Sequence, residues 1–396
     1  MSGRRAPIVI VVGWAAAVYS AGVAKSTGAI RARARSTAPI LATFIYLHLY
    51  PLPIFSRTRY IVTIKSLTHH KILLLYVKSR ASGRIRECPS QNYLTGVAGL
   101  GGSGEGLGSV VEPRSLIRLL EELLRSEHAE APRSSISLEG SWLGAMVAGG
   151  MGYFSAKIVG VYPGNPSRRL PLVRGVLLLF RSSDGEKVLD IPAEEPTGWR
   201  TAAASALALS KLGFGGGGVL GVIGAGVQAR YHLRVLTSVF RFDEILVASR
   251  RVETGERLAR EFGGRRVGRR ELLKRSHVVI AATNSTDPVV EGGLLRRGAY
   301  VASVGAPRPV RELDDQVKRR AGCMLVDSDI ACEESDDACG VETVTLRDYV
   351  RGVASCRWGD VYVYKSVGTP VFDLAAAIHI YERLRGSGSV STSSRV

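Results

Sequence analysis

One short turn constrains the fold of this chain more than any other feature: Gly224-Ala225-Gly226-Val227-Gln228-Ala229. It follows an apolar run at residues 219–223 that predicts a buried strand, and it precedes a helical pattern at residues 231–240. Gly224 permits a tight turn, and Gly226 lets backbone N–H groups approach a pyrophosphate. The alanine that ends the motif lets the helix pack close to the strand. This context predicts the phosphate-binding turn of a dinucleotide fold.

Strand-like and helical segments alternate beyond the turn. Further strands are predicted at residues 244–248, 277–283, 300–304 and 324–327, with a helix at residues 253–262. Such alternation predicts a parallel sheet covered by helices on both faces. The expected fold is therefore an α/β protein with a Rossmann-like doubly wound parallel sheet that binds a nicotinamide nucleotide. The alternative is a glycine-rich turn that holds no ligand.

The end of the second predicted strand indicates which nucleotide is bound. NAD-specific folds usually carry an acid there for the ribose 2′-hydroxyl, whereas this chain has Ser249, Arg250 and Arg251. Two guanidiniums and a hydroxyl suit a 2′-phosphate, so NADP(H) is favoured and NAD(H) is the alternative, with a solvated basic turn as the plainer interpretation. The residues expected to bind the cofactor are Thr201, Gly224, Gly226, Val227, Gln228, Ser249, Arg250, Arg251, Thr283 and Val304.

Several further segments occur in an order that resembles one family. They are Pro132-Arg133, Ala156-Lys157-Ile158-Val159, Pro163-Gly164-Asn165, Thr197-Gly198-Trp199-Arg200-Thr201-Ala202-Ala203, Val363-Tyr364-Lys365-Ser366-Val367-Gly368 and Asp373-Leu374-Ala375. Together with the glycine turn, they make residues 113–385 similar to the ornithine cyclodeaminase and mu-crystallin family. The resemblance implies hydride transfer at an amino or imino carbon, as in ornithine cyclodeaminases, archaeal alanine dehydrogenases and cyclic imino acid reductases.

Three cationic residues in these segments are candidates for the substrate site. Thr197 is expected to cap a helix, which places Arg200 in its first turn, where a cation is unfavourable unless an anion is bound there. Lys157 shares the face of a predicted strand with apolar residues and needs an anionic partner or a lowered pKa. The resemblance implies that Arg133, Lys157 and Arg200 bind a substrate carboxylate and that Lys157 also transfers a proton. A surface arginine and an edge-strand lysine are the plainer alternatives.

One position departs from the family pattern. Ornithine cyclodeaminases carry an aspartate where this chain has Pro307, so we expect inefficient cyclisation of ornithine. Asp287 is a nearby carboxylate, although a turn role before proline suits it better. The alternatives to an imino acid reductase are an ornithine cyclodeaminase or alanine dehydrogenase, a nucleotide-binding protein without turnover, and a membrane-tethered form.

The net charge of +18 is unevenly distributed. Residues 1–110 hold fourteen Lys or Arg and two Glu, so two thirds of the excess lies there and a nucleic-acid partner is not indicated for the rest. This part contains an uncharged apolar stretch at residues 6–24, which predicts a membrane anchor, a basic appendage or a start assigned too far upstream, with the last favoured.

The expected domain organisation follows from these segments. Residues 1–109 form an atypical N-terminal extension, residues 110–197 with 343–385 a substrate-binding and dimerisation domain, residues 198–342 the Rossmann domain, and residues 386–396 a disordered tail. A cytoplasmic homodimer acting on a small molecule is expected. The five cysteines show no Cys-x-x-Cys spacing, so neither a metal site nor a disulfide framework is predicted.

Overall fold

The computed structural model describes residues 60–66, 73–79, 107–305 and 308–386. The chain divides into two compact units, residues 1–92 and 93–396. In the first unit, β1 (Tyr60–Ser66) and β2 (Leu73–Ser79) form an antiparallel pair. The apolar stretch at residues 6–24 and the expected tail beyond residue 386 lie outside the described residues.

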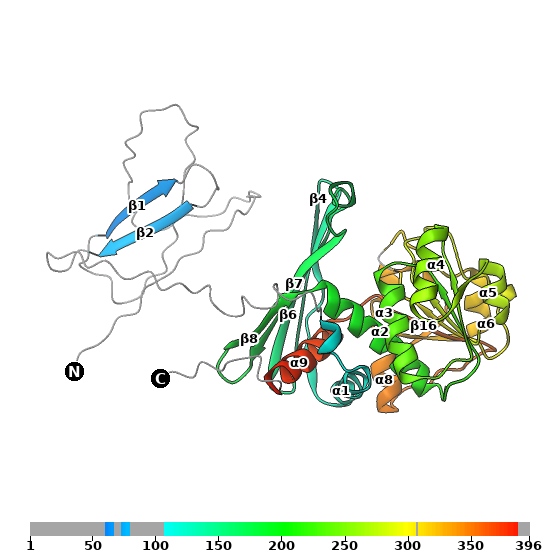
Figure 1. Ribbon diagram of the computed structural model, residues 1–396. Helices are drawn as coiled ribbons and strands as arrows, with labels where there is room; N and C mark the ends of the chain where they lie inside the picture. The colour runs from blue at the N-terminus through cyan, green and yellow to red at the C-terminus, as the bar shows by residue number, and fades with distance from the viewer. Residues whose placement is uncertain (1–59, 67–72, 80–106, 306–307, 387–396) are drawn as a thin grey trace, which may run out of the picture. The chain divides into compact units, whose positions relative to one another are not determined.

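An eight-stranded sheet forms the core of the part predicted to bind a nucleotide (Figure 1). Its strands, in spatial order, are β11 (Arg265–Arg266), β10 (Glu244–Ala248), β9 (Val219–Ile223), β12 (Val278–Ala281), β13 (Tyr300–Ser303), β16 (Tyr362–Lys365), β14 (Cys323–Val326) and β15 (Glu342–Thr345). All neighbouring strands are parallel. The chain order reverses between β9 and β12, which is where doubly wound sheets bind their ligands.

Two hydrophobic cores cover the two faces of this sheet. Leu220 and Val222 of β9 belong to a core shared with α2 (Glu194–Lys211) and α3 (Val227–Val239). Ile223 belongs to the opposite core with α5 (Arg269–Arg275) and α6 (Asp315–Ala321). The strands are buried on both sides, so the predicted doubly wound α/β fold is confirmed.

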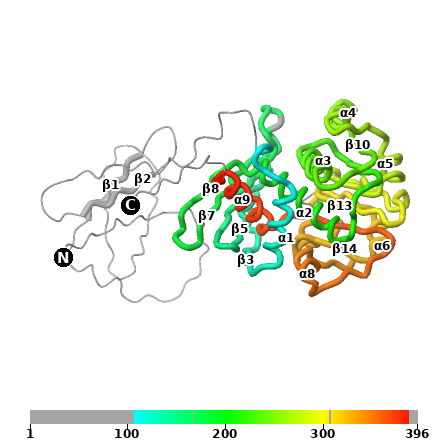
Figure 2. The backbone as a smooth tube through the Cα atoms, turned by 60° about the horizontal axis from the view of Figure 1, so that its bottom comes forward, coloured from blue at the N-terminus to red at the C-terminus, as the bar shows by residue number. Residues whose placement is uncertain are grey.

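An antiparallel sheet of six strands lies beside this part of the chain (Figure 2). Its strands are β3 (His128–Glu130), β4 (Ser134–Leu138), β5 (Ser141–Gly150), β6 (Tyr153–Val161), β7 (Val173–Arg181) and β8 (Lys187–Pro192). The helix α9 (Pro370–Gly386) packs against β5, β6 and β7, and α1 (Pro113–Arg125) packs against α9. Segments distant in sequence thus pack together, because α9 lies against strands that end between 189 and 220 residues before it begins.

The remaining helices are short. They are α4 (Val252–Glu261), α7 (Ala331–Glu334) and α8 (Leu346–Arg351), with 3₁₀ turns at Leu107–Ser109, Pro166–Arg168, Gly292–Leu294 and Asp336–Ala338. In the described part of the chain, no helix has the length and apolar character needed to span a bilayer. The strand β16 lies between β13 and β14 although it falls within the segment 343–385 that the sequence predicts for the substrate domain.

The helix α2 joins the two sheets and begins earlier than the sequence suggests. Its first turn holds Glu194, Glu195 and Pro196, residue types that favour a helix N-terminus. Thr197 is not the N-cap, because its hydroxyl donates to the Ala193 carbonyl at 2.6 Å from inside the helix. The predicted cap is therefore wrong, and Arg200 lies in the second turn.

The expectation that the cysteines form no disulfide framework is wrong for four of the five. Cys323 pairs with Cys356 and Cys332 with Cys339, at Cα separations of 5.5 and 4.7 Å, while Cys88 lies outside the described residues. Sequence spacing did not reveal the first pair, because only the pairing of β14 with β16 brings the two chain segments together. Within the described residues, no His, Cys, Asp or Glu group is arranged to hold a metal.

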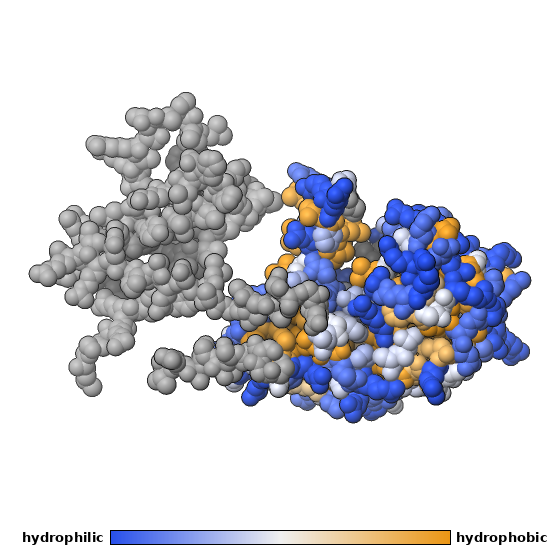
Figure 3. All heavy atoms as spheres, in the orientation of Figure 1, coloured by the Kyte–Doolittle hydropathy of each residue, from blue (hydrophilic) through white to orange (hydrophobic). Residues whose placement is uncertain are grey.

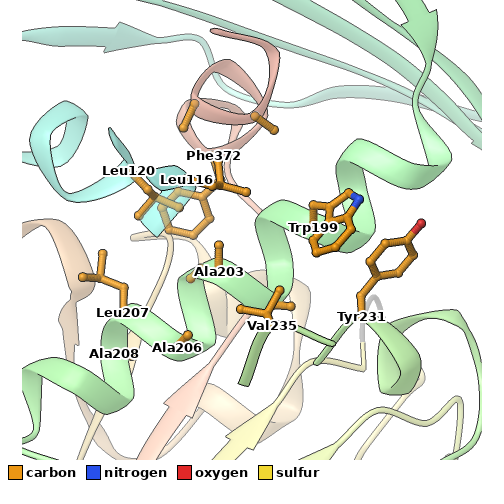
Figure 4. Close-up of a cluster of buried hydrophobic side chains, with 14 of the residues drawn as sticks. Leu116, Leu120, Trp199, Ala203, Ala206, Leu207, Ala208, Tyr231, Val235 and Phe372 are labelled. Atoms are coloured by element: carbon orange, nitrogen blue, oxygen red, sulfur yellow. The ribbon is translucent and has the colours of Figure 1, made fainter. Parts of the chain in front are cut away.

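Close packing of α2 against α3 depends on a glycine (Figure 4). Trp199 and Tyr231 meet edge to face with ring centroids 5.1 Å apart. A Cβ at the neighbouring Gly198 would lie 2.2 Å from the Tyr231 ring. Any larger side chain at this position therefore forces the two helices apart.

We predict that Gly198→Ala destabilises the fold by about 1–3 kcal/mol, because the added methyl group overpacks a buried helix contact. Chemical denaturation measures the loss. Gly164→Ala is the matched control, since a Cβ there meets no atom within 4 Å. Equal stability of the two variants would contradict the overpacking explanation.

Candidate functional site

Two of the predicted cations meet on one buried carboxylate. Asp373, on α9, lies 2.6 Å from Lys157 Nζ and 3.1 Å from Arg200 Nε. The side chains of Lys157, Arg200 and Asp373 are only 2%, 7% and 2% exposed. Three elements contribute one charge each: β6, α2 and α9. The predicted need of Lys157 for an anionic partner is met by Asp373, whose role the sequence analysis did not identify.

Lys157 reaches this cluster because of strand alternation in β6. Ser155 and Lys157 point inward and are buried, whereas Phe154 and Ile158 lie on the opposite, exposed face. A lysine on the inner face of a sheet is costly unless it is paired. The ion pair with Asp373 of α9 offsets this cost.

Arg133 joins the same cluster from the loop between β3 and β4. Its guanidinium donates to the carbonyls of Val367 at 3.1 Å and Gly368 at 2.8 Å, and it forms an ion pair with Glu334 at 2.5 Å. Gly368 has a φ of +91°, and a Cβ there would lie 3.0 Å from Arg200 Nη2 and 3.5 Å from Arg133 Nη2. Both guanidiniums therefore converge on this glycine, and the structure brings all three predicted substrate residues together.

A second buried aspartate shapes the loop at Gly368. Asp327, directly after β14, accepts from the Ser366 hydroxyl at 2.6 Å and from the backbone N–H groups of Val367 and Gly368 at 2.9 and 2.7 Å. These bonds fix the carbonyls to which Arg133 donates. Sequence reasoning missed both Asp327 and Glu334, because neither belongs to a segment that resembled the family.

The electrostatics of the cluster bring the pKa of the Lys157 amine close to neutral pH. Burial lowers the pKa of Lys157 to about 8; Asp373 opposes this shift, and Arg200 and Arg133 add to it. Burial also raises the pKa of the Glu334 carboxyl, against the effect of Arg133. An amine that exchanges its proton near physiological pH is suited to acid–base chemistry.

The glycine turn has the geometry expected of a phosphate site. Gly224 has a φ of +115°, and a Cβ there would lie 2.3 Å from the Ala282 carbonyl oxygen. Gly226 is the N-cap of α3, and no side chain accepts a capping hydrogen bond from the first N–H groups of this helix. No atom lies within 4 Å of the place that a Cβ of Gly226 would occupy. Open space in front of a helix N-terminus suits an anion, so these residues fit the pyrophosphate of a dinucleotide.

The other predicted cofactor residues lie at the ends of strands or on helices. Val227 and Gln228 open α3, Thr283 follows β12 and Val304 follows β13. Because the strands are parallel, these ends share the edge of the sheet that carries the glycine turn. Thr201 lies on α2, where its hydroxyl donates to the Thr197 carbonyl at 2.8 Å.

A buried carboxylate that the sequence did not suggest holds two of these strand ends. Glu312 accepts from the Thr283 N–H at 2.6 Å and hydroxyl at 2.8 Å, and from the Ser303 hydroxyl at 2.9 Å and the Gly305 N–H at 2.8 Å. Lys365, also buried, donates to Ser303 Oγ and the Gly305 carbonyl. The loops after β12 and β13 are thus fixed by charge-assisted hydrogen bonds.

The basic turn after β10 carries no acid. Arg250 and Arg251 are exposed, and the Ser249 hydroxyl donates to the Arg251 carbonyl at 2.6 Å. Pro307, where the family places an aspartate, lies outside the described residues. Asp287 is exposed in a turn in which the Ser285 hydroxyl donates to its carbonyl at 2.7 Å, as its predicted turn role requires.

Comparison with known proteins shows which family this chain is similar to. The model of the ornithine cyclodeaminase/mu-crystallin family matches residues 111–388. Mouse ketimine reductase mu-crystallin is 33% identical over 235 residues, covering 58% of this chain and 75% of that protein. Alanine dehydrogenase of Archaeoglobus fulgidus is 28% identical over 267 residues, covering 63% and 83%.

A solved structure shares both the fold and a related sequence. The Δ1-pyrroline-2-carboxylate reductase of Thermococcus litoralis, in complex with NADH and L-proline, aligns with a TM-score of 0.66 and 27% identity. The alignment covers 71% of this chain and 96% of that one. The resemblance inferred from the sequence segments is confirmed, and the chain belongs to the ornithine cyclodeaminase/mu-crystallin family.

Proposed function

We propose that this protein is an NAD(P)(H)-dependent oxidoreductase that acts at the amino or imino carbon of a small amino acid or cyclic imino acid. The observation that carries the proposal is the convergence of Arg133, Lys157 and Arg200 around Asp373 and Gly368. Relatives named ketimine reductase, alanine dehydrogenase and pyrroline-2-carboxylate reductase support the reaction class.

The cationic side chains take separate roles in this proposal. Arg133 and Arg200 bind the substrate carboxylate, because guanidinium pairs match carboxylate geometry. Lys157 Nζ gives a proton to the nitrogen that is reduced, or accepts one in the oxidative direction. Asp373 is the positioning residue that keeps Lys157 and Arg200 in place. A bound nicotinamide nucleotide supplies or accepts the hydride.

NADP(H) is the favoured cofactor in the proposal, and NAD(H) is the alternative. Gly224, Gly226, Val227 and Gln228 hold the pyrophosphate, Thr201, Thr283 and Val304 line the rest of the nucleotide site, and Ser249, Arg250 and Arg251 receive the 2′-phosphate. Ornithine cyclodeaminase and alanine dehydrogenase activities are alternatives within the class, and a nucleotide-binding protein without turnover is the alternative from another class. Pro307 disfavours the cyclodeaminase, because proline offers no proton-transfer group.

A second copy of the chain is the proposed partner. The face of the antiparallel sheet opposite α9 exposes the apolar side chains of Ile136, Leu138, Leu143, Val147, Phe154 and Ile158. Figure 3 shows hydrophobic surface in the region of β4. Phe154 and Ile158 are 51% and 42% exposed. An identical face offers the same chemistry, so two sheets pack face to face in a symmetric dimer.

The test of the proposed function is a substrate panel. NADPH and NADH oxidation is measured with cyclic imino acids and with keto acids plus ammonia, beside NAD(P)⁺-linked ornithine and alanine assays. Imine reduction is expected, with little turnover of ornithine. Rapid formation of proline and ammonia from ornithine would favour the cyclodeaminase, and binding without any turnover would favour the non-catalytic alternative.

We predict that kcat/KM for imine reduction falls as pH rises through about 8, because the Lys157 pKa of about 8 sets the loss of the proton that Lys157 donates. In the oxidative direction kcat/KM rises through the same range, since the neutral amine is the base. Asp373→Asn removes the negative charge that raises the pKa of Lys157, so the fall of kcat/KM for imine reduction moves to lower pH. Asp190→Asn, which removes the exposed partner of Lys187, is the control and leaves the profile unchanged.

Gly226→Ala is expected to abolish nucleotide binding without loss of stability, because its Cβ meets no protein atom and enters the space proposed for the pyrophosphate. NADPH fluorescence and thermal denaturation measure the two effects. Gly224→Ala is the contrasting variant and loses stability as well, since its Cβ would strike the Ala282 carbonyl. Unchanged NADPH affinity in Gly226→Ala would remove the turn from the cofactor site.

We predict that Phe154→Glu combined with Ile158→Glu yields a monomer in sedimentation velocity, because buried charges at a sheet-to-sheet contact are strongly unfavourable. The buried Lys157 and its partners lie on the other face of β6, so we expect the double variant to keep the fold. Val353→Glu, at a residue 71% exposed in the loop after α8, is the control. A double variant that sediments like the unmodified protein would exclude this face as the interface.

A further inference from the structure

A third guanidinium lies beside the basic turn after β10. Arg266 is the last residue of the edge strand β11, paired in register with Val247 of β10. Its Nη2 lies 3.4 Å from the Ser249 carbonyl oxygen. The side chain therefore crosses from one strand end to the next and reaches the residues that follow β10.

The side chain of Arg266 is held in place by its surroundings, unlike those of the two arginines of the basic turn. It is part-buried, whereas Arg250 and Arg251 are exposed. Gly255 in α4 makes room for it, because a Cβ there would lie 3.2 Å from Arg266 Cδ and 2.2 Å from Ser249 Oγ. The stem of Arg266 and the Ser249 hydroxyl thus pack against the same turn of α4.

The charges of this cluster lack anionic partners. Across the described residues, Arg250, Arg251 and Arg266 form no ion pair with an acid, and Arg266 Nε is buried without a hydrogen-bond acceptor. The adjacent Arg265 differs, since it pairs with Glu244 at 2.9 Å and Glu271 at 3.0 Å. A guanidinium without an acidic partner leaves its charge unneutralised, and a bound anion would neutralise it.

The start of α4 adds further donors to this place. Arg251 is the N-cap of α4 and the helix receives no side-chain cap, so its first N–H groups are free to bind an anion. Glu253, the acid of that first turn, is exposed. Guanidiniums and helix N–H groups together match the three acceptor oxygens of a phosphate monoester.

We propose that Arg266 is the residue that determines cofactor specificity, by completing a site for the 2′-phosphate of NADP(H). This inference rests on the proposed function, in which a nicotinamide nucleotide binds at the glycine turn. A fixed guanidinium loses less conformational freedom on binding than the exposed Arg250 and Arg251 do, so it contributes more of the discrimination.

Binding of two nucleotide fragments tests the inference without any turnover. Isothermal titration calorimetry compares adenosine 2′,5′-bisphosphate with 5′-AMP on the full chain and on its variants. Arg266→Ala is expected to weaken the bisphosphate roughly 10- to 100-fold and to leave 5′-AMP unchanged, since one charge-assisted contact is lost. Arg266→Lys restores part of the affinity. Arg265→Ala, on the same strand with its own acidic partners, is the matched control and changes neither ligand.

The outcomes separate this inference from the proposed function. The preference for the bisphosphate could survive Arg266→Ala and be lost when Arg250→Ala is combined with Arg251→Ala. That result overturns the role of Arg266 and leaves the proposed NADP(H) preference intact. Equal affinity of the unmodified protein for both fragments overturns it together with the NADP(H) preference, while imine reduction with NADH would leave the reaction class intact. Equal weakening of both fragments by Arg266→Ala points to a structural role and also overturns the inference.

Discussion

The interaction on which the site depends is the pair of contacts that Asp373 makes with Lys157 and Arg200. Each partner comes from a different element, and none of the three charges has ready access to water. Removing one member of such a group leaves an uncompensated buried charge, which costs about 3–5 kcal/mol. The position of α9 on the antiparallel sheet is therefore fixed by chemistry as well as by apolar packing. The same contacts hold the Lys157 amine where its pKa falls to about 8.

The parallel sheet contributes the second constraint, because it gathers its carboxyl ends along one edge. Glu312 shows how tightly that edge is fixed: its one carboxylate accepts four hydrogen bonds from the loops after β12 and β13. Asp327 does the same for the loop that carries Gly368. Buried acids thus position backbone that no regular ladder holds, so the loops at this edge are rigid enough to orient small ligands.

Local patterns made much of this fold predictable, and long-range contacts account for what was missed. The apolar run before Gly224 predicted a buried strand. The alternation of residues in the strand that contains Lys157 predicted a lysine on its apolar face. Both patterns depend only on neighbours in sequence. The helix start at Thr197 was wrong, since acids and a proline three residues earlier form the first turn. Asp373, Glu312 and the Cys323–Cys356 bridge depend on segments distant in sequence, and no spacing rule indicates which acid or thiol will meet which partner.

The helix α2 connects the two halves of the site through adjacent residues. Arg200 binds Asp373, and Trp199 packs edge to face on Tyr231 of α3, the helix whose N-cap is Gly226. Gly198 lets those helices approach closely, because no Cβ fits beside the Tyr231 ring. The helix α2 is buried along most of its length, so packing on several sides fixes its position relative to both contacts. The distance between the cations proposed to bind the substrate carboxylate and the turn proposed to bind the pyrophosphate is therefore set by one helix, and hydride transfer between two separately bound molecules requires such a fixed spacing.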